Sequence, residues 1–182
     1  MNRLVLVDGR GPLPRKSEAA LPGGDEGTFA TLDAMAGIIA ESIDDPSIGA
    51  LADKVRATAA ASGIDVATSV YNLLRDRQEF VRDPNGQEML EHPAPHAKQI
   101  LNGGKFRGDC DDVAILGASL LRAAGVAEPM LFVASDRGKD APYRHVFYGM
   151  KEDGKPVPFD PQTKTPPRTF SPRIKRLAGY PL

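Results

Sequence analysis

The chain has 182 residues, of which 41% are hydrophobic and 26% are charged, so it is able to bury a core of single-domain size. Its net charge of −1 gives no electrostatic basis for binding nucleic acid, and no apolar run approaches the roughly 20 residues that a membrane span needs. The apolar run at 4–7 is too short for a secretory signal, and a single cysteine suits a reducing compartment, so we expect a cytoplasmic protein.

The first 27 residues are typical of an arm that precedes the main domain. The strand-like run at 4–7 is followed by a turn-rich stretch with several prolines at 12–24. Because proline fixes φ and lacks an amide donor, we predict an extended N-terminal arm over 1–27. The same reasoning predicts a proline-rich tail over 164–182, so the folded domain is expected to span 28–163.

Apolar residues at spacings of three and four predict helices in the first half of the chain. Pro46 begins one of these helices and Gly63 ends it, whereas Asp65 caps the next. The residue before Pro84 resists helical backbone, so that helix ends there. The predicted helices are 29–43, 47–62 and 65–81.

The next segment is predicted to be irregular before a fourth helix begins. Residues 84–95 contain three prolines and are expected to be loop, followed by one or two helical turns at 96–101. Asp109 is the expected N-cap of a helix over 110–124, because the apolar period resumes directly after it and stops at Gly125.

The sequence period changes from helical to strand-like after this helix. Residues 129–135 are rich in strand formers, and 143–150 alternate between two faces, with His145 and Phe147 on the same one. A polar turn then leads into a third strand at 156–160. Helices followed by an antiparallel sheet over 129–160 predict the α+β class.

The motif GDCDDVA at 108–114 holds the only cysteine of the chain, Cys110, in the predicted first turn of a helix. Aligned amide dipoles lower the pKa of a thiol there, and the unpaired N–H groups are able to hold an oxyanion. The neighbouring aspartates oppose a thiolate; we expect Asp109 to cap the helix and Asp111 and Asp112 to face solvent or an arginine, with Arg107 or Arg122 as partners of Asp112. The alternative is a buried structural thiol.

A nucleophilic thiol needs a base and a group that orients the base. His145 is the candidate base and Asp160, at the end of the next strand, is the candidate orienting carboxylate. Each stands a few residues outside the turn at 151–155, so the two side chains are expected to be cross-strand or diagonal neighbours.

These motifs together resemble the transglutaminase-like superfamily of papain-like cysteine enzymes. The cysteine motif at 108–114, the block RHVFY at 144–148 and the block PFDPQ at 158–162 occur in the order that the family uses, and the resemblance covers about 65–163. It implies a papain-like core, a protein or peptide substrate and a triad of Cys110, His145 and Asp160. Gln99 and Gln78 are candidates for an oxyanion donor by residue type only.

The sequence departs from the family at its aromatic residues. Phe147 and Phe159 stand where many members have tryptophan, and the chain has no tryptophan. The resemblance therefore implies a cysteine-dependent hydrolase or acyl transferase, such as a peptidase or amidase, and leaves the choice between hydrolysis and amine transfer open. No cofactor is expected.

Metal binding is the first alternative use of these residues. His92, His96 and Cys110, with Asp111 or Asp112, are ligand types that zinc accepts. His92 and His96 are four residues apart, but the prolines between them argue against a helix that presents both. We therefore predict no metal site.

The second alternative is a protein that keeps the fold without the reaction. The arms at 1–27 and 161–182 are long for a small enzyme and suit docking on other subunits. Short proteins of this superfamily occur in phage and prophage genomes, so the resemblance also allows a catalytically idle structural component of a virion, found in the host cytoplasm or in the particle. A fold alone does not fix which function is present.

Overall fold

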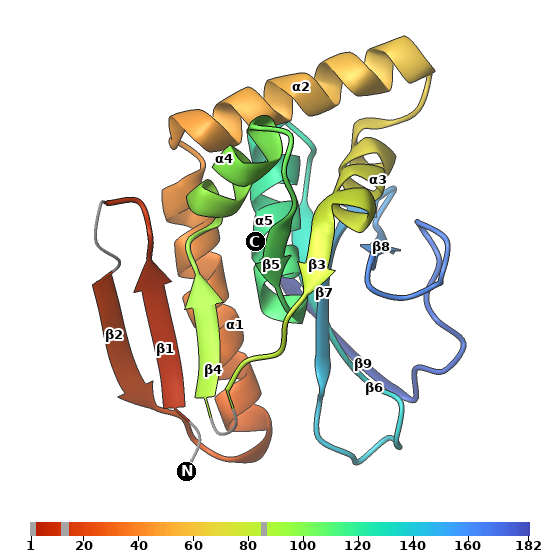
Figure 1. Cartoon of the computed structure of the whole chain (residues 1–182). Helices are drawn as coiled ribbons and strands as arrows, with labels where there is room; N and C mark the ends of the chain where they lie inside the picture. Colours follow the sequence, from red (N-terminus) through yellow and green to blue (C-terminus); the bar gives the residue numbers. More distant parts are fainter. Residues whose placement is uncertain (1–2, 12–14, 85–86) are drawn as a thin grey trace.

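The computed structural model describes residues 3–11, 15–84 and 87–182. In these residues five helices and three sheets form an α+β structure, which confirms the predicted class (Figure 1). In the same residues no helix is both long and apolar enough to cross a bilayer.

The helices begin and end where the local sequence satisfies their terminal backbone groups. Asp45 caps α2 by accepting a hydrogen bond from the Ser47 amide, and Gly63 ends this helix in the left-handed conformation that glycine favours. Asp65 caps α3 through the Thr68 amide. The helices are α1 (Gly24–Ser42), α2 (Pro46–Ser62), α3 (Val66–Arg77), α4 (Pro93–Leu101) and α5 (Cys110–Ala123).

The strands form one mixed, one parallel and one antiparallel sheet. The mixed sheet has the order β2-β1-β4 and contains β1 (Arg3–Asp8), β2 (Arg15–Ala20) and β4 (Gln87–Glu91). The parallel pair is β3 (Gln78–Phe80) with β5 (Phe106–Gly108). The antiparallel sheet has the order β8-β7-β6-β9 and contains β6 (Pro129–Ser135), β7 (His145–Glu152), β8 (Lys155–Phe159) and β9 (Arg176–Pro181).

Helix α5 lies at the centre of the molecule and is buried along most of its length. It packs on β6 and β7 of the antiparallel sheet, and all four other helices contact it (Figure 1). Every residue from Asp111 to Leu121 is buried. This arrangement fixes the first turn of α5, which holds Cys110, between the β1–β2–β4 sheet on one side and the antiparallel sheet on the other.

Three differences from the predicted elements have local causes. Helix α1 begins five residues earlier than predicted. Its first turn is polar, so the apolar period does not reveal it, and Asp25 and Glu26 lie favourably at the positive end of the helix dipole. Helix α3 ends at Arg77 rather than 81, since residues 78–80 pair with β5. Helix α4 begins at Pro93, within the predicted loop, because proline is tolerated in a first helical turn.

The two terminal segments contain strands. Within 1–27, the strands β1 and β2 form an antiparallel pair, and β1 also pairs with β4 in parallel. Within 164–182, β9 pairs antiparallel with β6 at the edge of the larger sheet. The β1–β4 and β6–β9 pairings join segments that are far apart in sequence, so neither follows from local patterns.

Gly117 of α5 tests how tightly this helix packs on the sheet. A Cβ atom at Gly117 would lie 2.4 Å from the ring of Tyr148, which is fully buried on β7. We expect Gly117→Ala to lower the free energy of unfolding by about 1–3 kcal/mol, since overpacked cores lose stability of that order. Urea denaturation measures the change.

Gly49→Ala is the matched control, because Gly49 is also helical and a Cβ there meets no atom within 4 Å. This change should stabilise the chain by about 0.5–1 kcal/mol through helix propensity. Equal effects of the two substitutions would contradict the tight contact between α5 and β7.

Candidate active site

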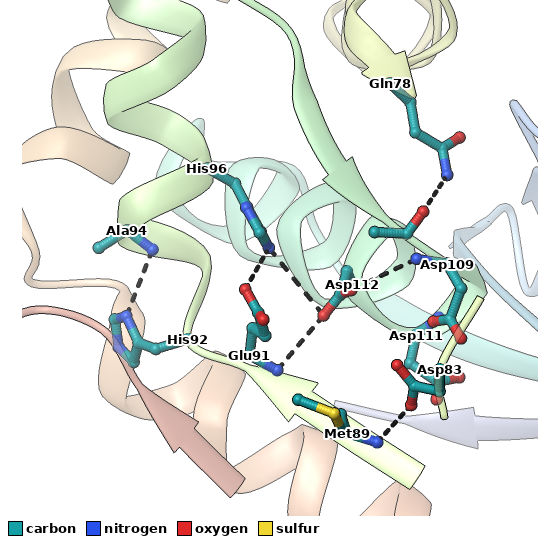
Figure 2. A network of polar contacts seen from close by, with 11 residues as sticks. Gln78, Asp83, Met89, Glu91, His92, Ala94, His96, Asp109, Asp111 and Asp112 are labelled. Carbon is teal, nitrogen blue, oxygen red and sulfur yellow. Dashed lines mark hydrogen bonds and ion pairs between the residues drawn. The ribbon is translucent and has the colours of Figure 1, made fainter. Parts of the chain in front are cut away.

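The first turn of α5 is closed by a capping box that surrounds Cys110. Asp109 is the N-cap, and its Oδ1 accepts a hydrogen bond from the Asp111 amide at 3.2 Å. The Asp112 carboxylate accepts a hydrogen bond from the Asp109 amide at 3.3 Å, which completes the box (Figure 2). The backbone of Cys110 is therefore held from both sides.

Asp112 also ties this turn to strand β4. Its Oδ1 accepts a hydrogen bond from the Glu91 amide at 3.3 Å (Figure 2). Gly108 allows the carboxylate to approach, because a Cβ at that position would lie 2.4 Å from the Asp112 carboxylate. Nearby, Gln78 Nε2 donates a hydrogen bond to the Gly108 carbonyl at 3.1 Å, which joins β3 to the same turn.

The prediction that Asp111 and Asp112 face solvent or an arginine is wrong. Both are buried, with 3% and 4% of their surfaces exposed. In the described part of the chain no ion pair joins Asp112 to an arginine, and Asp112 accepts backbone hydrogen bonds instead. Arg107 pairs with Glu79 at 3.7 Å. The capping role explains the difference, because it requires the carboxylate to point back at the helix start.

The burial of these carboxylates raises their pKa values. Burial is the main cause for all three aspartates, and the pKa of Asp109 rises to about 6. The nearby Glu88 side chain raises the pKa of Asp111 further.

The same surroundings raise the pKa of the Cys110 thiol well above its ordinary value. Burial is the largest cause, followed by the negative charges of Asp111 and Asp109. The backbone amide of Val146 acts in the opposite direction. Cys110 Sγ lies 3.6 Å from Asp111 Oδ1 and donates to it. At neutral pH the group is therefore a thiol, in contrast to the lowering that a helix N-terminus produces by itself.

His145 and Asp160 are brought together by the pairing of β7 with β8. Tyr148 pairs with Phe159, so Asp160 follows the end of β8 and is a diagonal neighbour of His145. His145 Nε2 lies 2.8 Å from Asp160 Oδ2. Because Asp160 occupies Nε2, the other ring nitrogen, Nδ1, is the one left for a reacting group.

Cys110 and His145 line one cavity of about 750 Å³, which also borders the N-terminal turn of α1 and residues Glu88 and Asp111. A second cavity of about 600 Å³ is lined by His145, Asp160 and Gln78. Of the three residues predicted as a triad, His145 and Asp160 are in direct contact, and Cys110 borders one cavity together with His145.

The two candidate oxyanion donors are placed differently. Gln78 borders the second cavity and reaches the turn that precedes Cys110. Gln99 is an exposed residue of α4 and is not among the residues that line either cavity. Of the two, only Gln78 lies near the candidate nucleophile.

The histidines of the alternative zinc set lie apart from Cys110. His92 caps α4 by accepting a hydrogen bond from the Ala94 amide, and His96 Nε2 lies 3.4 Å from Glu91 Oε2 and 4.0 Å from Asp112 Oδ1 (Figure 2). Burial lowers the pKa of His96 to about 4. The potential ligand atoms of Asp109, Cys110 and Asp111 lie within 4.8 Å of one another, and neither histidine belongs to this group.

Sequence reasoning missed several residues of this region. Asp83 accepts a hydrogen bond from the Met89 amide beside the capping box, Glu88 contacts Asp111, and Gln162 and Arg144 border the cavities. The one signal available from the sequence was position: Arg144 is next to His145, and Gln162 is two residues after Asp160.

No protein-family model matches the chain, and no curated protein matches it. Among solved structures, EGTA-treated LapG from Legionella pneumophila is similar to it at 18% sequence identity, with a TM-score of 0.42. The alignment covers 85% of this chain and 73% of that one. A likeness of this level assigns neither a family nor an activity, so the transglutaminase-like resemblance stays a prediction.

The acidic surroundings of Cys110 predict the effect of removing one charge. Asp109→Asn keeps a residue that caps helices well and removes a carboxylate that raises the pKa of the thiol. We expect the variant to have a lower thiol pKa and to react faster with iodoacetamide at pH 8. The rate of alkylation from pH 6 to 10 measures both quantities at the single cysteine.

Asp44→Asn is the control, because Asp44 is exposed and borders neither cavity. It should leave the alkylation profile unchanged. An Asp109→Asn profile identical to that of the wild type would show that the carboxylate does not act on the thiol.

The raised pKa of Asp109 also predicts a pH dependence of stability. The folded chain binds this proton up to about pH 6, whereas the unfolded chain loses it near 3.8. The bound proton stabilises the fold at low pH, and this contribution is lost as the pH rises from about 4 to 6. The free energy of unfolding of Asp109→Asn, relative to wild type, should therefore increase over that window and be constant above pH 7.

Urea denaturation of both proteins at pH 4, 5, 6 and 7 measures this difference. The opposite slope from His96, whose pKa is lowered, is present in both proteins and cancels. A difference that does not change with pH would contradict the buried position of the Asp109 carboxyl group.

Proposed function

We propose that the chain is a cysteine-dependent hydrolase or acyl transferase that acts on an amide or peptide bond of a protein or peptide substrate. Cys110 is the nucleophile, His145 the base and Asp160 the residue that orients the base. The observation that carries the proposal is the 2.8 Å contact of His145 Nε2 with Asp160, with Cys110 on the wall of the same cavity as His145. These are the three chemical roles that an activated thiol requires.

The protonated thiol determines how the first step proceeds. Since burial and two carboxylates keep the pKa of Cys110 high, the proton leaves the sulfur as attack on the carbonyl begins. His145 Nδ1 accepts it, and Asp160 accepts the Nε2–H and so fixes this tautomer and the ring orientation. The imidazolium that forms is stabilised by the Asp160 carboxylate.

The negative charge that develops on the substrate oxygen needs donors near Cys110. The capping box uses the Asp109 and Asp111 amides, so the backbone donor that we assign is the Cys110 amide at the start of α5. Gln78 adds an amide whose first hydrogen is held by the Gly108 carbonyl, which leaves the second free to point at the substrate. We therefore assign Gln78, and not Gln99, to the oxyanion site.

Collapse of the tetrahedral species completes acylation. The carbon–nitrogen bond breaks, His145 returns its proton to the leaving amine, and a thioester remains on Cys110. Water resolves this thioester in a peptidase or amidase, and an amine resolves it in a transferase. Every proton in this sequence passes through His145, so the proposal uses no cofactor.

The first test uses the single cysteine as its own reporter. p-Nitrophenyl acetate transfers an acetyl group to an activated thiol and releases p-nitrophenol, which absorbs light. We expect His145→Asn to lower the rate of Cys110 acetylation roughly 10²- to 10⁴-fold, the usual contribution of a positioned acid–base group. His92→Asn is the matched control, because His92 borders neither cavity and asparagine keeps a capping side chain.

Cys110→Ala separates the enzyme from an idle assembly protein. The thiol is half-buried at the edge of a cavity, so its loss should abolish acetylation and change the melting temperature little. Acetylation of the wild type that is slow and indifferent to His145 would overturn the proposed enzyme. It would instead favour the alternative of a catalytically idle virion component.

A further inference from the structure

Two walls of the cavity that Cys110 borders come from segments far apart in the sequence. We call this cavity, of about 750 Å³, the cysteine cavity. Residues within 21–35, at the start of α1, form one wall. Residues 142–146, which lead into β7 and include His145, form another. The separation of these two walls therefore determines the room that a substrate has beside the thiol.

The start of α1 has few local restraints. The helix follows a glycine pair, and its N-cap, Gly23, has no side chain that could cap the first turn. Gly24 has a φ of 64°, in the left-handed region that glycine adopts readily. The position of this wall therefore depends on contacts that its side chains make with other segments.

Arg176, the first residue of β9, makes contacts with both walls. Its Nη1 and Nη2 donate to Oδ1 and Oδ2 of Asp25, in the first turn of α1, at 3.0 and 2.5 Å. Nη1 also donates to the carbonyl of Ala141, directly before the second wall, at 3.0 Å. The guanidinium carbon lies 4.1 Å from the centre of the Tyr143 ring, which is part of that wall. A single side chain thus joins the two segments.

Strand β9 is a firm base for this contact. It pairs with β6 along its whole length. Tyr180 lies four residues after Arg176, on the same face of the strand, and donates to Asp33 Oδ1 of α1 at 2.5 Å. The rings of Phe29 and Tyr143 also meet edge to face, with centres 6.5 Å apart, and so connect the same two walls.

The geometry at Arg176 is stronger than that of an ordinary surface ion pair. Exposed pairs contribute little in general, because water and salt compete with them. A two-pronged contact with a carboxylate fixes the orientation of the guanidinium, and stacking on an aromatic ring adds a second attraction. The Arg176 side chain makes both contacts and is only 23% exposed.

We propose that Arg176 is a positioning residue that holds the start of α1 and the segment 142–146 at the separation that the acyl part of a substrate requires. This inference rests on the proposed function. His145 is held independently by β7 and by the 2.8 Å contact with Asp160. Loss of Arg176 should therefore weaken substrate binding and leave the acylation step itself unchanged.

The experiment compares two esters that acylate Cys110 and release p-nitrophenol. The six-carbon chain of p-nitrophenyl hexanoate extends into the cysteine cavity, whereas the acetyl group of p-nitrophenyl acetate occupies only the space beside the sulfur. We expect Arg176→Gln to raise the half-saturating concentration of the hexanoate about threefold to tenfold, the range that one or two polar contacts account for. The maximal rate with hexanoate and the rate with acetate should both stay unchanged.

Related variants test the assigned partners. Arg176→Lys keeps the charge but not the planar fork, so its effect should be intermediate. Asp25→Asn should also raise the half-saturating concentration, and combining it with Arg176→Gln should add nothing to the effect of Arg176→Gln alone. Arg168→Gln is the matched control, because Arg168 pairs with Glu152 and borders neither cavity. It should leave both constants unchanged.

Hydrogen exchange tests the positioning without any reaction. Amides of 24–30 and 141–146 should exchange faster in Arg176→Gln than in the wild type, and at the wild-type rate in Arg168→Gln. Unchanged exchange would overturn the inference alone. So would a lower melting temperature with an unchanged half-saturating concentration of hexanoate, which is the result of a merely structural role. Absence of Cys110 acylation in the wild type would overturn the proposed function, and the inference with it.

Discussion

The burial of helix α5 governs the arrangement of the groups around it. The helix contacts the four other helices and strands of all three sheets, so the polar groups of its first turn need partners inside the protein. Asp109 and Asp112 supply them through the capping box, and Asp112 extends the contact to β4 by accepting the Glu91 amide. The position of Cys110 is a direct result, because the residue lies between the two capping aspartates and has little freedom to move.

The same constraint determines the chemistry of the thiol. The amide dipoles of a helix start favour a thiolate, whereas burial and nearby carboxylates disfavour it. Around Cys110 the second effect is the larger, and the pKa of the thiol is raised. A nucleophile of this kind depends on a base that takes the proton during attack, which gives the His145–Asp160 pair its importance. The aspartates of this turn therefore stabilise the start of the helix and at the same time raise the pKa of the thiol.

The candidate site brings together residues from three parts of the chain: the β7–β8 hairpin, the start of α5 and strand β3. The β7–β8 hairpin sets His145 beside Asp160 through local register, and its other face packs on α5 through Tyr148. Gln78 reaches the turn before Cys110 from β3, on the opposite side. Two cavities form where these parts meet, one bordered by the sulfur and one by the carboxylate of the candidate triad.

Several features followed from the sequence because they depend on neighbours a few residues away. The α+β class, the caps at Asp65 and Asp109, and the His145–Asp160 proximity all follow from periodicity, capping preference and a short hairpin. The tertiary structure was needed to show the burial of Asp111 and Asp112 and the pairing of β1 and β9 with distant strands. The physical reason is that desolvation and long-range strand register depend on which segments pack together. A local pattern records the preference of a residue for a helix or a strand, but not what will cover it.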